Sequence, residues 1–585
     1  MAQGIAITGS GIICSIGTDS QAVLHALKKQ ERGIGTLTYV ESVHKELPVG
    51  EVKLTNDEMK ASLGLHADID YSRTSLIGAI ALRQALNESG LSAEKLNSKK
   101  VVFISGTTVG GMDVTERHYK NMLSDADEAS YVIHHDCGNN TREIAEICGL
   151  NCETTTISTA CSSALNAIIL ATRMLLSKEA DIIIAGGTEA LSRFHLNGFN
   201  SLLILDNEPC RPFDASRRGL NLGEGAAYIV IERSDDAKKR NAHILGYIGG
   251  WGNRCDAHHQ TATSENGEGA YLAMSDAIQM SGISLQEINY INAHGTGTPD
   301  NDRSESAALR RVFGKDLPPV SSTKSFTGHT TSASGSIETV ICLLAMHHSF
   351  IPANLGWKAS SEDCIKPSSY QENVTLHHVL CNSFGFGGND SSLLISDKEI
   401  LLEEILPTET HIVSEFEVTD DETLKEVRQY VSPMESRRMS KMVKASILSS
   451  MRVLEDAHIT TPDAIVIGTQ YGMLEQGEKI LDYLSTEGEE NLSPTLFMQS
   501  THNTIAGTLA IRLKCHGYNV TYSQGSDSLR WAINEAERLI SEGKANNVLV
   551  GVHDQCPEGF RQRFKVAGLE EPTALYSKSL IITKK

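Results

Sequence analysis

The sequence predicts an α/β protein whose sheets are largely buried between layers of helices. Short apolar runs bounded by glycine or aspartate recur along the chain, at residues 101–105, 181–187, 227–232 and 391–396. Longer segments with helical spacing of apolar residues lie between them, and the segment 161–176 is apolar on nearly every side. Continuous apolar strands that alternate with helices are typical of sheets covered on both faces.

The composition is that of an ordinary globular protein and excludes several classes of function. Hydrophobic residues make up 40% and charged residues 21% of the 585 residues, which is enough chain for about three or four domains. The formal net charge of −21 offers no counter-charge to a phosphate backbone, so we expect no nucleic-acid partner. No apolar run approaches the roughly 18 to 20 residues of a membrane helix, so we expect no membrane partner either.

Cysteine usage and the N-terminus predict a cytoplasmic location. The chain has 12 cysteines and no CxxC pair, a density far below that of disulfide-stapled proteins. The N-terminal segment MAQGIAITGSGIICS has no basic region before its short apolar stretch. It therefore resembles a strand and a turn rather than a secretory signal.

A second region of the chain repeats the pattern around Cys161. When Cys161 is aligned with Ser526, an offset of 365 residues, the segments 158–186 and 523–551 share a polar turn, a long helix and an apolar strand in the same order. Repeated order and spacing predict an internal repeat, whose boundary we expect in the acidic stretch around residues 398–430. Identical residues at this offset are Ser158, Ser163, Ala167, Ile168, Ala171, Arg173, Ala180 and Gly186, which match Ser523, Ser528, Ala532, Ile533, Ala536, Arg538, Ala545 and Gly551.

Cys161 is the candidate nucleophile. It lies in STACSSAL, between a strand-like TTTIS segment and the start of a helix. Most lone cysteines are inert parts of a core, but the free amides and positive dipole end of a helix start lower the pKa of a thiol and favour the thiolate. The small neighbours Ala160, Ser162 and Ser163 leave room for a substrate.

Two histidines occupy similar junctions between a strand and a loop. His294 lies in NAHGTGTPDND after the apolar run INYINA, and His329 lies in SSTKSFTGHTTSASG after the strand-like PPVSST. One thiol and two imidazoles are the groups that an acyl-transfer site needs, because the thiolate accepts the acyl group while the imidazoles stabilise charge on a second thioester. Spacing alone does not establish that the three side chains meet.

Four motifs in order, TACSSA, NAHGTGT, KSFTGHT and NSFGFGG, resemble those of the elongating β-ketoacyl-acyl-carrier-protein synthases over about residues 1–398. The segment PCRPFDASRRGLNLGEGAA is also similar to that family. The resemblance implies a thiolase fold of two similar βαβαβαβ halves in five layers, here followed by a third, truncated half. The expected domains are residues 1–250 with the nucleophilic cysteine, residues 251–398 with the two histidines, and residues 399–585 as a degenerate copy of the first half.

The same resemblance implies a decarboxylative Claisen condensation in fatty acid or polyketide synthesis. Cys161 is expected to carry the acyl chain, while His294 and His329 stabilise the thioester oxygen of a malonyl donor as it loses carbon dioxide. Lys324 and Glu338 fall where the family has its active-site lysine and supporting glutamate. This chemistry needs no metal and no redox cofactor, so we expect neither.

The resemblance also assigns the residues around the nucleophile. The backbone amides of Cys161 and Phe386 are expected to form the oxyanion hole, and Phe386 in GFGG is expected to gate the acyl pocket, since its glycine neighbours allow movement. Asp302 and Glu305 are expected to brace the HGTGT loop. The sequence departs from the family at GFGGND, where GFGGTN is usual, which puts the geometry of that loop in doubt.

The expected partner is an acyl carrier protein. Thr296 and Thr298 match threonines that hold the phosphopantetheine arm of the donor in the family. Arg217 and Arg218 offer a basic loop for docking an acidic carrier, although a solvated loop is the more ordinary interpretation. The resemblance implies a homodimer, and a heterodimer with a ketosynthase-like subunit is the alternative.

The C-terminal copy lacks the means to catalyse condensation. Its nucleophile position holds Ser526, and the chain has no second HGTGT or GHT motif after it. A half-domain of this type has apolar surfaces that pack on another half, so we expect it to dock as a mimic of a partner subunit. His502 and Ser526 make a weak candidate for a hydrolase pair, because no GxSxG motif is present.

Two other functions stay open at this point. The chain could be a non-catalytic subunit of the chain-length-factor or scaffold type, although Cys161 is present. It could be a thiolase that acts on coenzyme A thioesters with Cys381 as a second cysteine, although the GFGG context of Cys381 is that of the synthases. Acyl length, saturation and the cognate carrier do not follow from the sequence.

Overall fold

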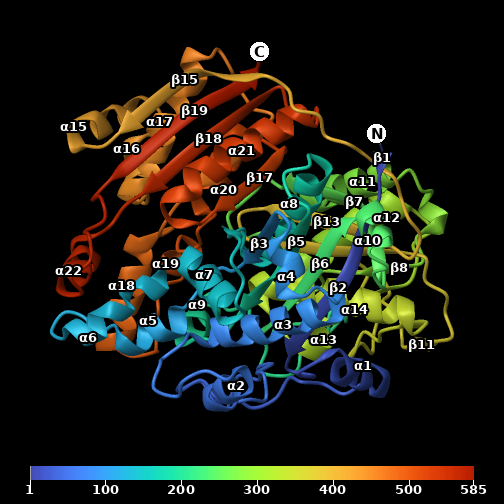
Figure 1. The fold of residues 1–585 in the computed structure, drawn as a ribbon. Helices are drawn as coiled ribbons and strands as arrows, with labels where there is room; N and C mark the ends of the chain where they lie inside the picture. The colour runs from blue at the N-terminus through green and yellow to red at the C-terminus, as the bar shows by residue number, and fades with distance from the viewer. Residues whose placement is uncertain (1) are drawn as a thin grey trace.

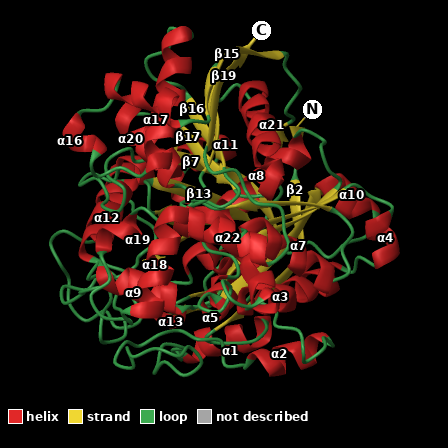
Figure 2. Cartoon of the chain, turned by 90° about the vertical axis from the view of Figure 1, so that its left-hand side faces the viewer, coloured by secondary structure: helices red, strands yellow, loops and turns green. Residues whose placement is uncertain are grey.

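The structure is a computed structural model that describes residues 2–585 and is dominated by one mixed sheet. Its fifteen strands lie in the order β15-β19-β18-β16-β17-β4-β3-β5-β6-β2-β7-β13-β12-β8-β9. Figure 1 shows the C-terminal part of the chain, in orange and red, set against the N-terminal remainder. Figure 2 shows helices on both sides of the band of strands.

The first third of the chain forms a sheet with the order β4-β3-β5-β6-β2. The inner strands β4, β3 and β5 are parallel, and β6 and β2 close the sheet in antiparallel fashion. Fully apolar runs form these strands because both faces are covered. The elements are β2 (Ile5–Cys14), α3 (Arg73–Ser89), β3 (Val101–Gly106), α7 (Cys137–Ile147), β4 (Glu153–Ile157), α8 (Ser163–Leu176), β5 (Ile182–Glu189), α9 (Arg193–Ser201) and β6 (Gly225–Arg233).

The middle third continues the same sheet from β2 through β7. The order β7-β13-β12-β8-β9 follows, with β12, β8 and β9 parallel to one another. The elements are β7 (Gly246–Cys255), α11 (Glu268–Ser281), β8 (Tyr290–Asn292), α12 (Pro299–Phe313), β9 (Val320–Ser321), α13 (Lys324–Thr327), α14 (Ser334–His347), β12 (His378–Gly385) and β13 (Asn389–Ser396).

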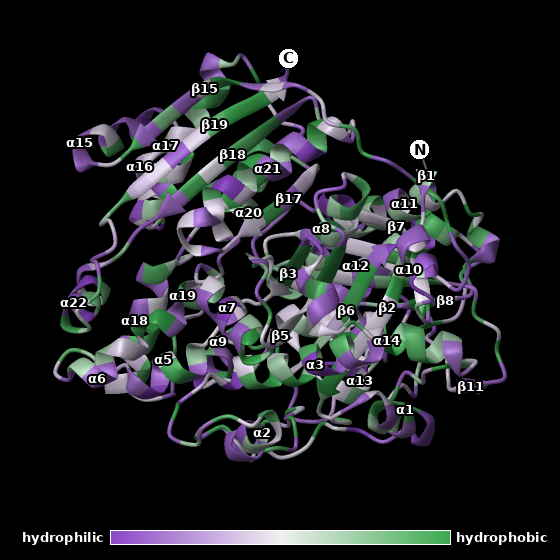
Figure 3. Cartoon of the chain, viewed as in Figure 1, coloured by the Kyte–Doolittle hydropathy of each residue, from purple (hydrophilic) through white to green (hydrophobic). Residues whose placement is uncertain are grey.

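Helices α8 and α14 form the central layer between these two halves. All fourteen residues of α8 are buried, as its apolar pattern predicts, and the helix packs on strands of both halves and on α14. Helix α3 covers the outer face of the first half, and α11 covers that of the second. Helix, sheet, helix, sheet, helix is the five-layered order of the predicted thiolase fold. Figure 3 shows polar residues concentrated on peripheral helices such as α6 (Ala126–Ala129) and α15 (Asp421–Leu424).

The last third rebuilds the first half, as the internal repeat predicts. Its strand order β17-β16-β18-β19-β15 reproduces β4-β3-β5-β6-β2, and β17, α21 and β18 begin and end 365 residues after β4, α8 and β5. The elements are β15 (Thr410–Val418), α17 (Lys441–Asp456), β16 (Ala464–Gly468), α18 (Leu474–Thr486), α19 (Pro494–Met498), α20 (Thr504–Leu513), β17 (Tyr518–Tyr522), α21 (Ser528–Ser541), β18 (Asn547–Asp554), α22 (Glu558–Val566) and β19 (Tyr576–Lys584). We call residues 399–585 the C-terminal copy.

The C-terminal copy docks on the first half about a local two-fold axis. Strands β4 and β17 meet antiparallel, and the Ser158 amide donates to the Thr521 carbonyl at 3.0 Å. The Ser523 amide returns an equivalent bond to the Thr156 carbonyl at 2.9 Å. Since both bonds join positions related by the 365-residue offset, each copy presents the same surface to the other. The C-terminal copy therefore packs on the first half of the same chain.

A buried ion network fixes this junction. Arg173 of α8 and Arg538 of α21, which are equivalent residues, both pair with the fully buried Glu535. Arg173 also donates to Glu542 at 2.7 Å, and Arg538 donates to Glu179 at 2.7 Å. Two guanidiniums are thus held between three carboxylates, and three of the four pairings join one copy to the other.

Candidate active site

Cys161 lies on a single 3₁₀ turn between β4 and α8. The turn spans Ala160–Ser162, and Ala160 has a positive φ of 51°, a conformation that an L-residue adopts only where its surroundings hold it. The Ser383 hydroxyl of β12 donates to the Cys161 carbonyl at 2.8 Å. Helix α8 starts at Ser163, two residues later than the sequence indicates. The turn that carries the thiol is held by contacts from both halves of the fold.

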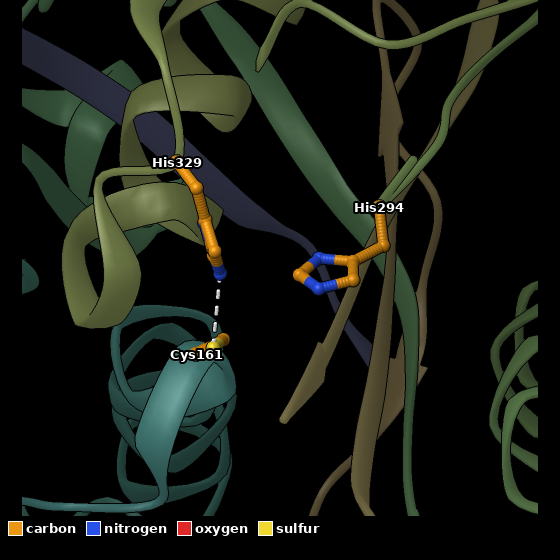
Figure 4. Close-up of side chains that lie close together, drawn as sticks. All are labelled: Cys161, His294 and His329. Atoms are coloured by element: carbon orange, nitrogen blue, oxygen red, sulfur yellow. Dashed lines mark hydrogen bonds between the residues drawn. The ribbon is translucent and has the colours of Figure 1, made fainter. Parts of the chain in front are cut away.

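The structure brings the three predicted reactive side chains together. The Cys161 Sγ lies 3.0 Å from His329 Nε2, and the His294 and His329 rings are 5.3 Å apart at 83°. Figure 4 shows His329 aimed at the sulfur and His294 across the gap from both. One ligand atom from each of the three residues lies within 4.8 Å of the others. The residues come from the ends of β4, β8 and α13, so the tertiary fold alone assembles them.

Burial keeps the resting thiol protonated. Removal of water from the sulfur raises the pKa of Cys161 to about 12, although Lys324 and the backbone amides of Phe386 and Cys161 act in the opposite direction. The direction is opposite to the lowered pKa expected from the sequence. The physical reason is that desolvation of a fully buried thiolate outweighs the helix-start effect.

Both histidines are neutral imidazoles. Burial, followed by the charge of Lys324, holds the pKa of His294 and of His329 well below the usual range. His329 Nδ1 lies 3.0 Å from the Ser334 hydroxyl, whereas His294 Nδ1 is buried without a hydrogen-bond partner among residues 2–585. A buried polar atom without a hydrogen-bond partner lowers the stability of the fold. The unpaired nitrogen therefore indicates a pocket that receives a polar group.

Lys324 and Glu338 form a buried ion pair beside the thiol. Lys324 Nζ donates to Glu338 Oε1 at 2.5 Å, and both side chains are almost fully buried. Burial raises the pKa of Glu338 to about 7, against the attraction of Lys324. The spacing of the Cys161 and histidine atoms would suit a metal ion, but the adjacent Lys324 ammonium opposes a second cation there.

Phe386 and its loop lie directly over the sulfur. The backbone amides of Phe386 and Cys161 both point at the Cys161 Sγ. The Phe386 ring is half-buried and stacks on Phe199 at 5.8 Å, and Gly387 has a φ of 84° that a side chain would strain. The Phe386 carbonyl accepts a hydrogen bond from the Asn503 side-chain amide at 2.8 Å, so the C-terminal copy contacts this loop.

The thiol stands where a large cleft and a small apolar cavity meet. The cleft has a volume of about 600 Å³ and is lined by His294, His329, Thr296 and Thr298 among others. The cavity has a volume of about 20 Å³ and walls that are almost wholly apolar. Cys161, Phe199 and Phe386 line both spaces. A polar arm and an apolar chain can therefore approach the sulfur from different sides.

Two carboxylates hold the loop that carries His294. Glu305 accepts the amides of His294 and Gly295 at 2.8 and 2.7 Å. Asp302 accepts the Gly297 amide at 3.1 Å and the Phe213 amide at 2.7 Å. The acidic pair thus braces the HGTGT loop from helix α12. The Thr296 and Thr298 hydroxyls lie 2.9 Å apart on the cleft wall.

The unusual asparagine in GFGGND is a buried hub that sequence reasoning missed. Asn389 Oδ1 accepts hydrogen bonds from Ser162 Oγ and Asn166 Nδ2, both at 2.7 Å. Asn389 Nδ2 donates to the Asn519 carbonyl of the C-terminal copy at 2.5 Å. The departure from the family pattern therefore connects the turn at Cys161 with the docked copy. The signal in the sequence was the GFGGND departure itself, which places Asn389 at the first position of β13.

Several other candidates lie elsewhere. The side chain of Arg217 is 6% exposed and donates to Asp363 at 2.8 Å, so the expectation that it docks a carrier is wrong. Arg218 is exposed and lines the cleft. His502 does not meet Ser526, since its Nε2 lies 3.6 Å from Cys137 Sγ. Cys381 is buried in β12, with its sulfur against the Gly335 carbonyl rather than in the reactive cluster.

Comparison with known families follows the division seen in the fold. The model for the N-terminal domain of β-ketoacyl synthases matches residues 2–237, and that for the C-terminal domain matches residues 245–358. A second N-terminal-domain model of β-ketoacyl synthases matches residues 414–584. The fold and the site thus define a thiolase-fold protein with a cysteine and two histidines at its centre.

Similar proteins and solved structures point to the same family as the family models. The chain is 33% identical to 3-oxoacyl-[acyl-carrier-protein] synthase 2 of Coxiella burnetii and 31% identical to Nodulation protein E of Rhizobium meliloti, over 67% of this chain and 98% and 99% of those proteins. The chain belongs to the β-ketoacyl synthase family. The ishigamide ketosynthase/chain length factor structure is 29% identical, covers 68% of this chain and 100% of its own, and has a TM-score of 0.64.

One solved structure follows the whole chain. The PfaC keto synthase-chain length factor covers 100% of this chain and 78% of its own, with a TM-score of 0.77 and 16% identity. At that identity the likeness concerns the fold alone. It extends over the C-terminal copy as well as the first two thirds. Among residues 2–585, no helix has the length and apolarity needed to cross a bilayer.

Proposed function

We propose that the protein catalyses the decarboxylative condensation of an acyl thioester with malonyl-acyl carrier protein, giving a β-ketoacyl-acyl carrier protein in fatty acid or polyketide biosynthesis. The observation that carries the proposal is the 3.0 Å approach of His329 to Cys161 at the junction of cleft and cavity, with His294 facing both. Relatives named 3-oxoacyl-[acyl-carrier-protein] synthase 2 support it.

In the first step Cys161 Sγ bonds to the acyl carbonyl carbon, the bond from that carbon to the carrier sulfur breaks, and the thiol proton leaves with the carrier thiol. The amides of Cys161 and Phe386 stabilise the oxyanion that forms between these events. Because the resting thiol is protonated, the neutral His329 at 3.0 Å accepts the thiol proton as the sulfur attacks and passes it to the departing carrier sulfur. The apolar cavity marks the side of Cys161 on which the acyl chain is proposed to lie.

In the second step the malonyl group loses carbon dioxide, and its electrons pass to the thioester oxygen as an enolate. His294 and His329 donate hydrogen bonds to that oxygen in a site from which water is largely excluded. The enolate carbon attacks the acyl-Cys161 carbonyl, the carbon–sulfur bond breaks, and the released thiolate takes a proton from solvent. Lys324, paired with Glu338, provides positive potential throughout.

The proposed partner is a phosphopantetheine-bearing acyl carrier protein. Thr296 and Thr298 line the cleft where the arm would pass, and Arg218 lies exposed at its wall. We also propose a cytoplasmic location, for which the twelve free cysteines are the support. The proposed domains are residues 1–250, 251–398 and 399–585, with the last as a non-catalytic copy.

Intact-protein mass spectrometry tests the function directly. Wild-type protein incubated with acyl-carrier protein is expected to gain one acyl mass, and malonyl-carrier protein is expected to discharge it into a β-ketoacyl product. Cys161→Ala is expected to show neither step. Wild type that takes up no acyl group from donors of any length would contradict the proposal and favour a non-catalytic subunit.

A further inference from the structure

Four buried asparagines join the turn at Cys161 to the C-terminal copy. They are Asn166 of α8, Asn253 of β7, Asn389 of β13 and Asn519 of β17. The Asn253 side-chain amide donates to Asn166 Oδ1 at 2.8 Å, and the Asn389 side-chain amide donates to the Asn519 carbonyl. The hydrogen bonds therefore run from the first half of the fold, through the middle third, into the C-terminal copy.

Asn389 holds the turn that carries Cys161 at two points. Its Oδ1 accepts hydrogen bonds from Ser162 Oγ and Asn166 Nδ2, both at 2.7 Å. Asn166 Nδ2 also donates to Thr159 Oγ1 at 2.9 Å. Since Thr159 precedes the turn and Ser162 ends it, the backbone amide of Cys161 lies between two points that this network fixes.

The C-terminal copy determines which end of the Asn389 amide faces the turn. A side-chain amide has an accepting oxygen and a donating nitrogen, and turning the group over exchanges them. The Asn519 carbonyl can only accept, so it holds Nδ2 at 2.5 Å and leaves Oδ1 for Ser162 and Asn166. With the amide reversed, the nitrogens of Asn389 and Asn166 would face each other as two donors, and the hold on the turn would be lost.

The same side chains satisfy the backbone of Asn519, where β17 lies beside β7. The Asn519 amide donates to Asn253 Oδ1 at 2.9 Å, and its carbonyl accepts from Asn253 Nδ2 at 3.1 Å as well as from Asn389. At the equivalent position of the first half, Thr154 is half-buried and its hydroxyl accepts from Gln524 Nε2 at 2.9 Å. The asparagine contacts therefore break the local two-fold symmetry on the side of the reactive cysteine.

We propose that Asn389 is a positioning residue for the acylation step and orients the turn at Cys161 only while the C-terminal copy is docked. The step it serves is the attack of Cys161 Sγ on the acyl carbonyl, because the Cys161 amide must point at the oxygen on which charge develops. The inference rests on the proposed function and adds to it a dependence of the nucleophile on the C-terminal copy. A displacement of about 1 Å at such a site costs about 10²-fold in rate.

Asn389→Ala is expected to lower the maximal rate of Cys161 acylation about 10- to 100-fold, while the half-saturating concentration of acyl-carrier protein stays within about twofold. The two quantities separate because Asn389 is fully buried and does not line the cleft by which the carrier arm would reach the sulfur. Gln524→Ala is the matched control. Gln524 is a buried side-chain amide that bridges the same two copies, but it bonds to Thr154 and Thr156 of β4 rather than to the turn.

Both quantities come from the time course of adduct formation, followed by intact mass at a range of acyl-carrier concentrations. An unchanged rate in Asn389→Ala, or an equal fall in Asn389→Ala and Gln524→Ala, overturns the inference and leaves the proposed function intact. If wild type forms no adduct, both fail together.

Asn389→Thr is the second variant, should Asn389→Ala fold poorly, because threonine is the usual residue of the family at this position. Its hydroxyl sits one bond closer to the backbone than the amide, out of reach of the Asn519 carbonyl. The same fall in maximal rate is expected, and a wild-type rate in this variant also overturns the inference.

Discussion

His294→Ala is expected to lower the rate of condensation about 10²–10³-fold, the usual cost of removing one donor from an oxyanion site. Acylation of Cys161 is expected to continue, because His329 rather than His294 lies against the sulfur, at 3.0 Å. The two half-reactions should therefore separate, with acyl-enzyme accumulating and carbon dioxide release becoming slow. The neutral state of His294 makes the donor available across the physiological pH range.

The separation is measured as acyl-enzyme by intact mass and as carbon dioxide released from malonyl-carrier protein. His259→Ala is the matched control, because His259 lines the same cleft but is exposed and accepts hydrogen bonds from the amides of Thr261 and Ala262. Equal losses of acylation and decarboxylation in His294→Ala would assign this histidine a structural role instead.

Glu535→Ala is expected to lower the free energy of unfolding at the junction of the two copies by about 3–5 kcal/mol, the range for breaking a buried ion pair from one side. Glu535 is fully buried and is the carboxylate shared by Arg173 and Arg538. Its removal leaves two buried guanidiniums with only Glu542 and Glu179 as partners. The loss is large because the arginines cannot move to water without undocking the copy.

Denaturant unfolding followed by the fluorescence of Trp531, buried on the same helix, reports this loss. Glu537→Ala is the control, because Glu537 is an exposed glutamate two residues further along α21. Similar unfolding midpoints for the two variants would show that the network does not stabilise the docked copy.

The repeat and the reactive residues could be predicted because a short, contiguous stretch of sequence carries the pattern of each. The match of Cys161 to Ser526 carries the strand, turn and helix of one copy onto the other without a gap, and the structure keeps that 365-residue offset in β17, α21 and β18. His294 and His329 were marked by glycine-rich motifs at the ends of apolar runs. Such motifs can be recognised in a sequence because the backbone at the site needs the conformational freedom of glycine.

Properties that depend on the assembled interior were not predictable. The pKa of Cys161 is raised by burial in the assembled fold, and no local pattern reports that depth. Arg217 looked free because its partner, Asp363, lies 146 residues away. Phe497 gave no signal, since it stands in a short helix of the C-terminal copy and reaches the cavity only through the tertiary fold.

The junction between β4 and β17 is formed within one polypeptide, so it does not depend on the protein concentration or on other proteins in the mixture. Because both surfaces belong to one polypeptide, their effective concentration is fixed by the connecting segment and does not fall on dilution. Separate subunits that pair across such a surface can exchange partners. In a mixture of related proteins, one cavity could then be lined by residues from two different proteins. In this chain Cys161 and Phe497 line one cavity and belong to one polypeptide, so each molecule carries the same pairing of these two residues.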